Sequence, residues 1–222
     1  MRRNPLLITI WIIILIALGL FLAGCQSTAT STGNPHLESG RTAIVDKKFD
    51  LALKELTTAV TEEPTNAEAY YLRGTAYYGR YDAAYAAKDP KADGEDFWRA
   101  ITDFTKAIEL NHNYAEAYHY RGLTFNGLQQ NGHALADYNI AIQLQPDMEF
   151  PYYGRAIVYE QEGHIQQAIA DYQKFMELSK DVYWKGEAQK RMNALLALSP
   201  TPAATPITTP TPSATPTPTS AP

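Results

Sequence analysis

AEAYYLRG, at residues 67–74, returns almost unchanged as AEAYHYRG at residues 115–122. A looser copy, PYYGRA, occupies residues 151–156. A second motif follows each copy, as AITDFTKAIEL at 100–110, ALADYNIAIQL at 134–144 and AIADYQKF at 168–175. The last two copies of this second motif begin at Ala134 and Ala168, 34 residues apart. Since motifs that recur at such a period are typical of repeat architectures, the middle of the chain is predicted to consist of stacked structural units.

The residues inside each unit resemble the tetratricopeptide repeat. That helix-turn-helix motif of about 34 residues has aromatic residues at positions 4, 11 and 24, small residues at positions 8, 20 and 27, and often proline at position 32. In the unit 115–148 all of these positions match, as Tyr118, Gly122, Phe125, Ala134, Tyr138, Ala141 and Pro146. The resemblance implies an all-α fold, a right-handed α-solenoid of helix-turn-helix units with a C-terminal capping helix.

We expect the repeat domain to cover residues 36–198, with repeats at 33–66, 67–114, 115–148 and 149–182 and a capping helix at 183–198. The capping helix has Trp184, Ala188, Met192 and Leu195 at helical spacing, which favours one face packed on the last repeat.

The second unit contains an insertion of 14 residues, because 48 residues separate the start of this unit from the start of the next. Residues 81–88 have high helix propensity and precede Asp89-Pro90, which ends a helix. The sequence therefore predicts a protruding helical lobe that carries Tyr81 and Tyr85, with the next helix beginning near Glu95.

The first 24 residues have the layout of a secretory signal, with Arg2 and Arg3 before an apolar run from Leu6 to Ala23. Leu22-Ala23-Gly24-Cys25 resembles the lipobox of bacterial lipoproteins. The resemblance implies that residues 1–24 are removed and that Cys25 carries covalent diacylglycerol and an N-acyl lipid, with no other cofactor. An uncleaved membrane-spanning helix is the alternative, because the apolar run is also long enough to cross a bilayer.

Two further segments flank the repeats. Residues 25–35 are rich in Ser, Thr and Gly and are expected to form a flexible tether. Residues 199–222 contain eight prolines, eight threonines and no charged side chain, which favours a disordered, polyproline-like tail. An O-glycosylated stalk has a similar composition and stays open as an alternative. Cys25 is the only cysteine, so a disulfide within one chain is impossible.

Charge and motifs argue against several classes of function. The formal charge is −5, and it becomes −7 once Arg2 and Arg3 are removed, so the phosphate backbone of a nucleic acid would be repelled. The sequence has no HExxH, GxSxG, P-loop, GxGxxG or CxxC motif, and its five histidines lack metal-ligand spacing. We therefore expect neither an enzyme nor a metal site.

An arginine and an aspartate recur once in each of three units. The pairs are Arg73 with Asp103, Arg121 with Asp137, and Arg155 with Asp171. Because the pattern repeats with the unit, these residues are predicted to form structural ion pairs between the two helices of a unit, not three active sites.

In tetratricopeptide repeat proteins a partner binds in the concave groove lined by the first helix of each unit. The residues here that correspond to the groove positions are Glu68, Tyr71, Thr75, Tyr78, His119, Leu123, Asn126, Tyr153, Ile157 and Glu160. The basic clamp that some family members use for a terminal carboxylate is absent. The aromatic, mildly acidic surface suits an extended peptide with apolar or basic side chains. Packing of the tyrosines against neighbouring helices is the alternative.

These features predict a membrane-anchored lipoprotein that acts as a scaffold or adaptor for a protein or peptide of the cell envelope. It would be exported and held by its lipid on the outer face of the cytoplasmic membrane, or on the outer membrane if the cell has one. A structural or self-assembling envelope component, associated with a pilus or the wall, is the alternative. A cryptic envelope enzyme is a third possibility, against which the missing motifs count.

Overall fold

The computed structural model describes residues 33–88 and 94–198, and every regular element within these ranges is an α-helix. The helices are α2 (Pro35–Val45), α3 (Phe49–Glu62), α4 (Ala67–Ala86), α5 (Glu95–Leu110), α6 (Ala115–Gly127), α7 (Asn131–Leu144), α8 (Glu149–Gln161), α9 (Ile165–Leu178) and α10 (Val182–Leu198). The expected signal peptide, Cys25 and the tail 199–222 lie outside the described residues, as does most of the tether.

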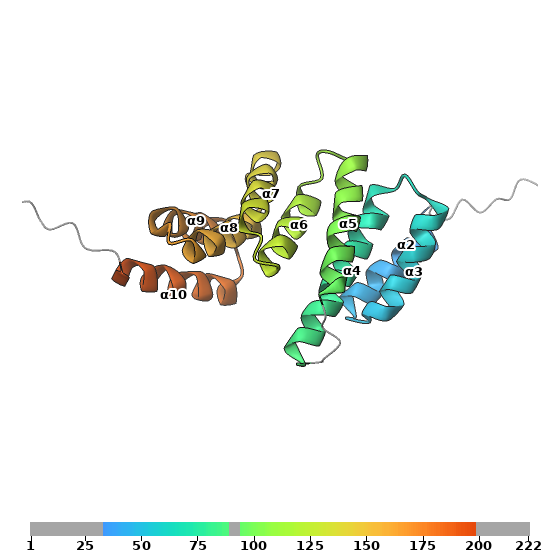
Figure 1. The fold of residues 1–222 in the computed structure, drawn as a ribbon, viewed down its shortest axis with the longest axis horizontal. Coiled ribbons are helices and arrows are strands. Elements are labelled where there is room, and N and C mark those ends of the chain that lie inside the picture. The colour runs from blue at the N-terminus through green and yellow to red at the C-terminus, as the bar shows by residue number, and fades with distance from the viewer. Residues whose placement is uncertain (1–32, 89–93, 199–222) are drawn as a thin grey trace, which may run out of the picture.

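Figure 1 shows the helices following one another along an elongated body, from α2 and α3 at one end to α9 and α10 at the other. Each helix packs chiefly on its neighbours in sequence. The fold is therefore an all-α helical-repeat solenoid, as the sequence predicts. Within the described ranges, no helix combines the length and the apolar character that crossing a bilayer requires.

Asparagine side chains begin α2 and α4. The Oδ1 atom of Asn34 accepts hydrogen bonds from the backbone N–H groups of His36 and Leu37 at 2.9 and 3.2 Å, and Asn66 caps α4 in the same way. Pro35 occupies the first turn of α2, where its missing N–H is harmless. Helical structure therefore begins at Pro35, inside the tether expected at 25–35, because Asn34 caps it there.

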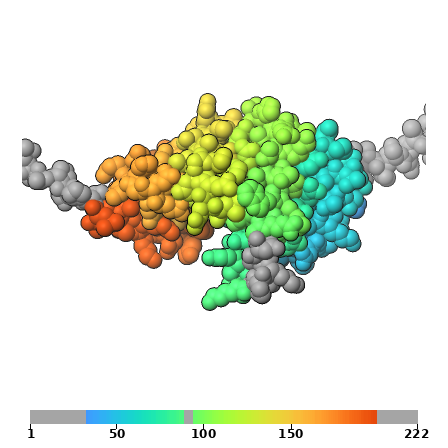
Figure 2. All heavy atoms as spheres, viewed as in Figure 1, coloured from blue at the N-terminus to red at the C-terminus, as the bar shows by residue number. Residues whose placement is uncertain are grey.

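The insertion lengthens α4, in agreement with the sequence-based expectation. α4 continues to Ala86, and α5 begins at Glu95. The end of α4 projects beyond the neighbouring helices (Figures 1 and 2). The Tyr81 ring contacts the Phe97 ring with centroids 3.8 Å apart, whereas Tyr85 is 68% exposed. Arg80 fixes the base of the projection, because its Nε and Nη2 atoms both donate to the Asp96 carboxylate at 2.7 Å.

Small residues allow the two helices of a unit to approach closely. A Cβ atom on Gly74 would lie 2.8 Å from the Phe104 ring, and one on Gly122 would lie 3.1 Å from the Tyr138 ring. Both rings are fully buried, as is Tyr172 at the equivalent position of the last unit. The packing explains why this sequence pairs small residues on one helix with aromatic residues on the other.

The predicted ion pairs are confirmed in all three units. Each arginine donates two hydrogen bonds, from Nε and Nη2, to both oxygens of its aspartate at 2.7–2.8 Å. Asp103, Asp137 and Asp171 are buried, so the charge of each carboxylate is compensated by its arginine. The pairs join α4 to α5, α6 to α7, and α8 to α9, and so fix the register within each unit.

The capping helix α10 packs on α9 and buries Ala188, Met192 and Leu195. Trp184 was expected on the same face but is 36% exposed. Its ring lies instead beside Phe150 and Tyr153 of α8, with centroids 6.0 and 5.5 Å apart. The first turn of α10 therefore contributes to a different surface from the remainder of the helix.

Candidate functional site

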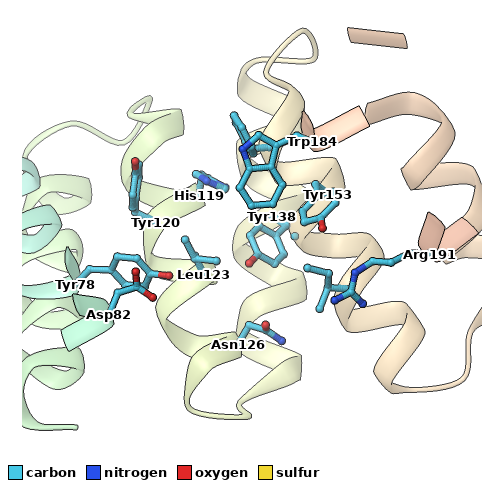
Figure 3. Close-up of a pocket in the computed structure, with 13 residues that line it drawn as sticks. Tyr78, Asp82, His119, Tyr120, Leu123, Asn126, Tyr138, Tyr153, Trp184 and Arg191 are labelled. Carbon is cyan, nitrogen blue, oxygen red and sulfur yellow. The ribbon is translucent and has the colours of Figure 1, made fainter. Parts of the chain in front are cut away.

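A pocket of about 580 Å³ is lined by residues of α4, α6, α7, α8 and α10. Its lining is mainly aromatic and aliphatic, and consists of Tyr78, Asp82, His119, Tyr120, Leu123, Asn126, Tyr138, Phe150, Tyr153, Gly154, Ile157, Trp184 and Arg191 (Figure 3). Asp82 comes from the projecting end of α4 and Arg191 from α10. Figure 2 shows the surface indented between these two elements.

The structure brings together a majority of the groove residues expected from the sequence. Tyr78, His119, Leu123, Asn126, Tyr153 and Ile157 line the pocket. They come from α4, α6 and α8, the first helices of three successive units, so one continuous hollow spans those units.

Four expected residues lie outside the pocket. Glu68 pairs with Arg41 of α2. Thr75 donates its hydroxyl to the backbone carbonyl of Tyr71 at 2.9 Å. Glu160 accepts hydrogen bonds from the Tyr172 hydroxyl at 2.6 Å and from Arg191 at 3.1 Å. These three side chains therefore already have partners within the fold.

Tyr71, the fourth, packs among other aromatic side chains. Its ring centroid lies 4.9 Å from that of Tyr114, 5.8 Å from that of Tyr120 and 6.2 Å from that of Phe104. Burial raises the pKa of the Tyr71 hydroxyl above its ordinary value. For Tyr71 the packing alternative holds, whereas Tyr78 and Tyr153 both pack on neighbouring rings and line the pocket.

Tyr138, on the second helix of its unit, was not among the expected groove residues. Its ring passes between Gly122 of α6 and Gly154 of α8, where a Cβ on either glycine would lie 3.1 or 2.5 Å away. The hydroxyl thereby reaches the pocket, and Figure 3 shows it on the side of Leu123. Asp82, Tyr120, Trp184 and Arg191 are the other pocket residues that carry aromatic or charged groups and were not expected in the groove.

Two buried polar atoms of the pocket have no hydrogen-bond partner within the described ranges. They are the hydroxyl oxygen of Tyr138 and the Nδ1 atom of His119. Burial raises the pKa of Tyr138 and lowers the pKa of His119 to about 4, so both side chains are neutral at pH 7. An unsatisfied buried polar atom costs about 1–3 kcal/mol, and a bound group that pairs with it recovers part of that free energy.

The equivalent tyrosine of the next unit shows what satisfies such a hydroxyl. Tyr172 donates to Glu160, and Glu160 also binds Arg191. The residue of the preceding unit that corresponds to Glu160 is Asn126, which donates to Gln161 at 3.1 Å instead. The substitution of asparagine for glutamate therefore leaves the Tyr138 hydroxyl available to a ligand.

The arrangement is suited to non-covalent binding. In the part of the chain that the structure describes, no cluster of His, Cys, Asp and Glu could hold a metal ion. The pocket offers aromatic rings, two neutral polar atoms, and one charged side chain of each sign, Asp82 and Arg191. These groups can hold an apolar segment and orient it by a small number of hydrogen bonds.

Comparison with known proteins agrees with the helical-repeat fold described above. Residues 151–182 match the model of the tetratricopeptide repeat family. The chain contains a tetratricopeptide repeat. Proteins with this repeat are generally non-enzymatic interaction scaffolds, and no catalytic family is indicated. Among curated proteins, no sequence matches significantly.

Solved structures of tetratricopeptide repeat proteins share the fold. TTC0263, a thermophilic protein of this kind from Thermus thermophilus, is 23% identical with a TM-score of 0.60, covering 73% of this chain and 80% of that one. MamA is 26% identical with a TM-score of 0.54, covering 70% and 79%. The first tetratricopeptide repeat domain of human RPAP3 is 22% identical with a TM-score of 0.50, covering 58% and 91%. The similarity to these structures establishes that the chain folds as an α-solenoid.

Proposed function

We propose that the protein is a lipid-anchored scaffold of the bacterial cell envelope that binds an extended segment of a partner protein in the pocket. The observation that carries this proposal is the pocket itself, in which aromatic rings surround two buried polar atoms that lack partners among the described residues. A fold built for interaction, and a lipobox-like sequence ahead of it, support the scaffold role and the anchor.

The chemistry of the lining indicates the kind of segment. Tyr78, Tyr120, Phe150, Tyr153 and Trp184 offer large contact areas to apolar or aromatic side chains. Asp82, at the α4 end, can pair with a basic side chain of the same segment. The pocket is lined by residues of three successive units, which suits an extended peptide better than a compact cofactor.

Photocrosslinking from inside the pocket tests the binding surface. Benzoylphenylalanine placed at Leu123 of α6 should form adducts with a partner protein in intact membranes, because Leu123 lines the pocket. Ala136 of α7 provides the matched control, since it belongs to the same unit but is exposed on the outer helix. Adducts of the same proteins at equal yield from both positions would exclude the pocket as the binding surface. Adducts with this chain alone would favour a self-assembling envelope component.

Metabolic labelling tests the anchor separately. Incorporation of a palmitate analogue into the wild-type chain, and its loss in Cys25→Ser, is the result expected of a lipoprotein. Equal labelling of Cys25→Ser, or no labelling of the wild-type chain, would contradict the lipid anchor without affecting the pocket.

A further inference from the structure

The proline- and threonine-rich segment 199–222 directly follows α10, the helix that supplies Trp184 and Arg191 to the pocket. We propose that this segment of the same chain binds in the pocket and competes there with the partner segment. The proposal rests on the proposed function, because it assigns a second, internal ligand to the same surface.

The backbone chemistry of the segment complements the pocket. Proline has no backbone N–H, and a polyproline helix forms no internal hydrogen bonds, so a sequence with eight prolines in 24 residues presents unpaired carbonyl acceptors together with proline rings. The pocket presents aromatic rings and the Tyr138 hydroxyl, which has no acceptor in the described part of the chain. Aromatic-lined grooves with a few donors are the usual receptors for such segments.

Charge favours the same occupant. The segment 199–222 contains no charged side chain. Arg191, at the α10 end of the pocket, is already paired with Glu160 at 3.1 Å, and Asp82 lies at the opposite end. A neutral ligand therefore fills the aromatic middle of the pocket without leaving a buried charge of its own unpaired.

The segment is long enough to reach the pocket. From Leu198 back to Trp184 the axis of α10 measures about 21 Å, at about 1.5 Å per residue. In Figure 1, α10 runs from the middle of the molecule toward one end, so the segment has to turn back along the helix. As a polyproline helix, 24 residues span about 74 Å, and roughly seven residues cover the return. About 17 residues are then available to occupy the pocket.

Attachment to the same chain makes even weak binding sufficient. A short flexible connection gives an effective concentration on the order of 1 mM. A segment whose intrinsic Kd is about 1 mM would then be bound in about half of the molecules. A partner has to compete with this internal ligand, so its apparent affinity should increase when the segment is removed.

Contact quenching by tryptophan tests the proposal in the full chain, with one copy in each lipid nanodisc. Cys25→Ser removes the native thiol and with it the lipid expected there, so the chain is held in the nanodisc by its retained apolar run, Leu6 to Ala23. Thr205→Cys provides the attachment point for a bimane fluorophore, which tryptophan quenches on contact, because about seven residues bring the segment back beside Trp184. Trp184→Phe should raise the bimane emission roughly twofold if about half of the segments are bound. Trp98→Phe is the matched control, because Trp98 is 52% exposed on α5 and does not line the pocket.

The outcomes separate this proposal from the proposed function. Equal emission from the Trp184→Phe chain and its parent would overturn internal binding, as would quenching that grows with nanodisc concentration, since that indicates contact between copies. Replacement of Pro206, Pro210, Pro212 and Pro216 by serine should relieve the quenching, and unchanged quenching would contradict recognition of the prolines. Crosslinking of a partner from Leu123 is a separate measurement, so it can succeed when internal binding fails.

Discussion

The hydroxyl oxygen of Tyr138 lies 2.7 Å from the position that a Cβ atom on Gly154 would occupy, and the Cζ atom of the same ring lies 2.5 Å from it. Tyr138 is fully buried and cannot move aside without displacing its neighbours. We therefore expect Gly154→Ala to lower the free energy of unfolding by about 1–3 kcal/mol through overpacking. Urea denaturation of the variant and the wild-type chain measures this difference.

Gly186 of α10 is the control for that substitution. A Cβ atom there would meet no other atom within 4 Å, so Gly186→Ala should raise the free energy of unfolding by about 0.5–1 kcal/mol through helix propensity. If both alanine variants changed the free energy of unfolding by the same amount, the close contact between Gly154 and Tyr138 would not be the cause of the change in Gly154→Ala.

The hydroxyl groups of Tyr138 and Tyr172 should respond differently to removal. Tyr138→Phe deletes a buried hydroxyl that has no partner within the described ranges, so the free energy of unfolding should stay equal or rise by up to about 1 kcal/mol. Tyr172→Phe deletes a donor to Glu160 and should lower it by about 1 kcal/mol. Equal losses in the two variants would show that the Tyr138 hydroxyl is already satisfied in the isolated protein.

The repeat pattern predicts those features of the fold that occur in the same way in every unit. The spacing of small and aromatic residues predicts the helix pairs, and the recurrence of Arg121 and Asp137 predicts their ion pair, because each depends only on packing within one unit. The break in the period predicts the longer α4. These features follow from local propensity and from contacts that every unit makes in the same way.

The pocket depends on differences between units, which is why the sequence predicts it only in part. Whether a groove tyrosine is open depends on the residues that follow its unit or end it, as the rings of Tyr120 in the next unit and Tyr114 at the end of its own unit pack on Tyr71. The position of Trp184 depends on how α10 docks, which no repeat describes. For Tyr138 the sequence does contain a feature that could have indicated its place in the pocket. Its unit has tyrosine where the unit before has Phe104, and Asn126 stands where the last unit has Glu160.

The interhelical ion pairs should contribute much more to stability than the surface pairs. Arg121→Ala leaves the Asp137 side chain, only 4% exposed, without its two strongest donors, and should lower the free energy of unfolding by about 3 kcal/mol. Lys174→Ala removes an exposed pair with Glu177 and should change it by less than about 0.5 kcal/mol. Thermal and urea denaturation of the Arg121→Ala and Lys174→Ala variants measure these changes in stability.

A double variant separates a lost ion pair from a stranded charge. Arg121→Met with Asp137→Leu removes both charges at once and should recover most of the stability lost in Arg121→Ala, because no buried carboxylate then lacks a partner. A double variant that is less stable than Arg121→Ala would contradict this explanation and would assign the loss to packing of the arginine side chain on Tyr118.

His119 should make stability depend on pH. Burial lowers its pKa to about 4 in the fold, against 6.5 for an exposed histidine. Above pH 6.5 the imidazole is neutral in both states, and its contribution to stability is complete. As the pH falls from 6.5 toward 4, the unfolded chain binds a proton that the fold excludes, and about 3 kcal/mol is lost progressively.

Urea denaturation across this pH range measures the slope. His119→Leu should reduce the fall in unfolding free energy between pH 6.5 and 4, even if its stability at pH 7 differs from that of the wild-type chain. His133→Gln is the matched control, because it removes an exposed histidine of α7 and leaves His119 in place. Carboxylates contribute to the acid response of all three proteins alike, so the difference between slopes reports on His119 alone. A slope unchanged by His119→Leu would mean that the imidazole accepts a proton inside the fold.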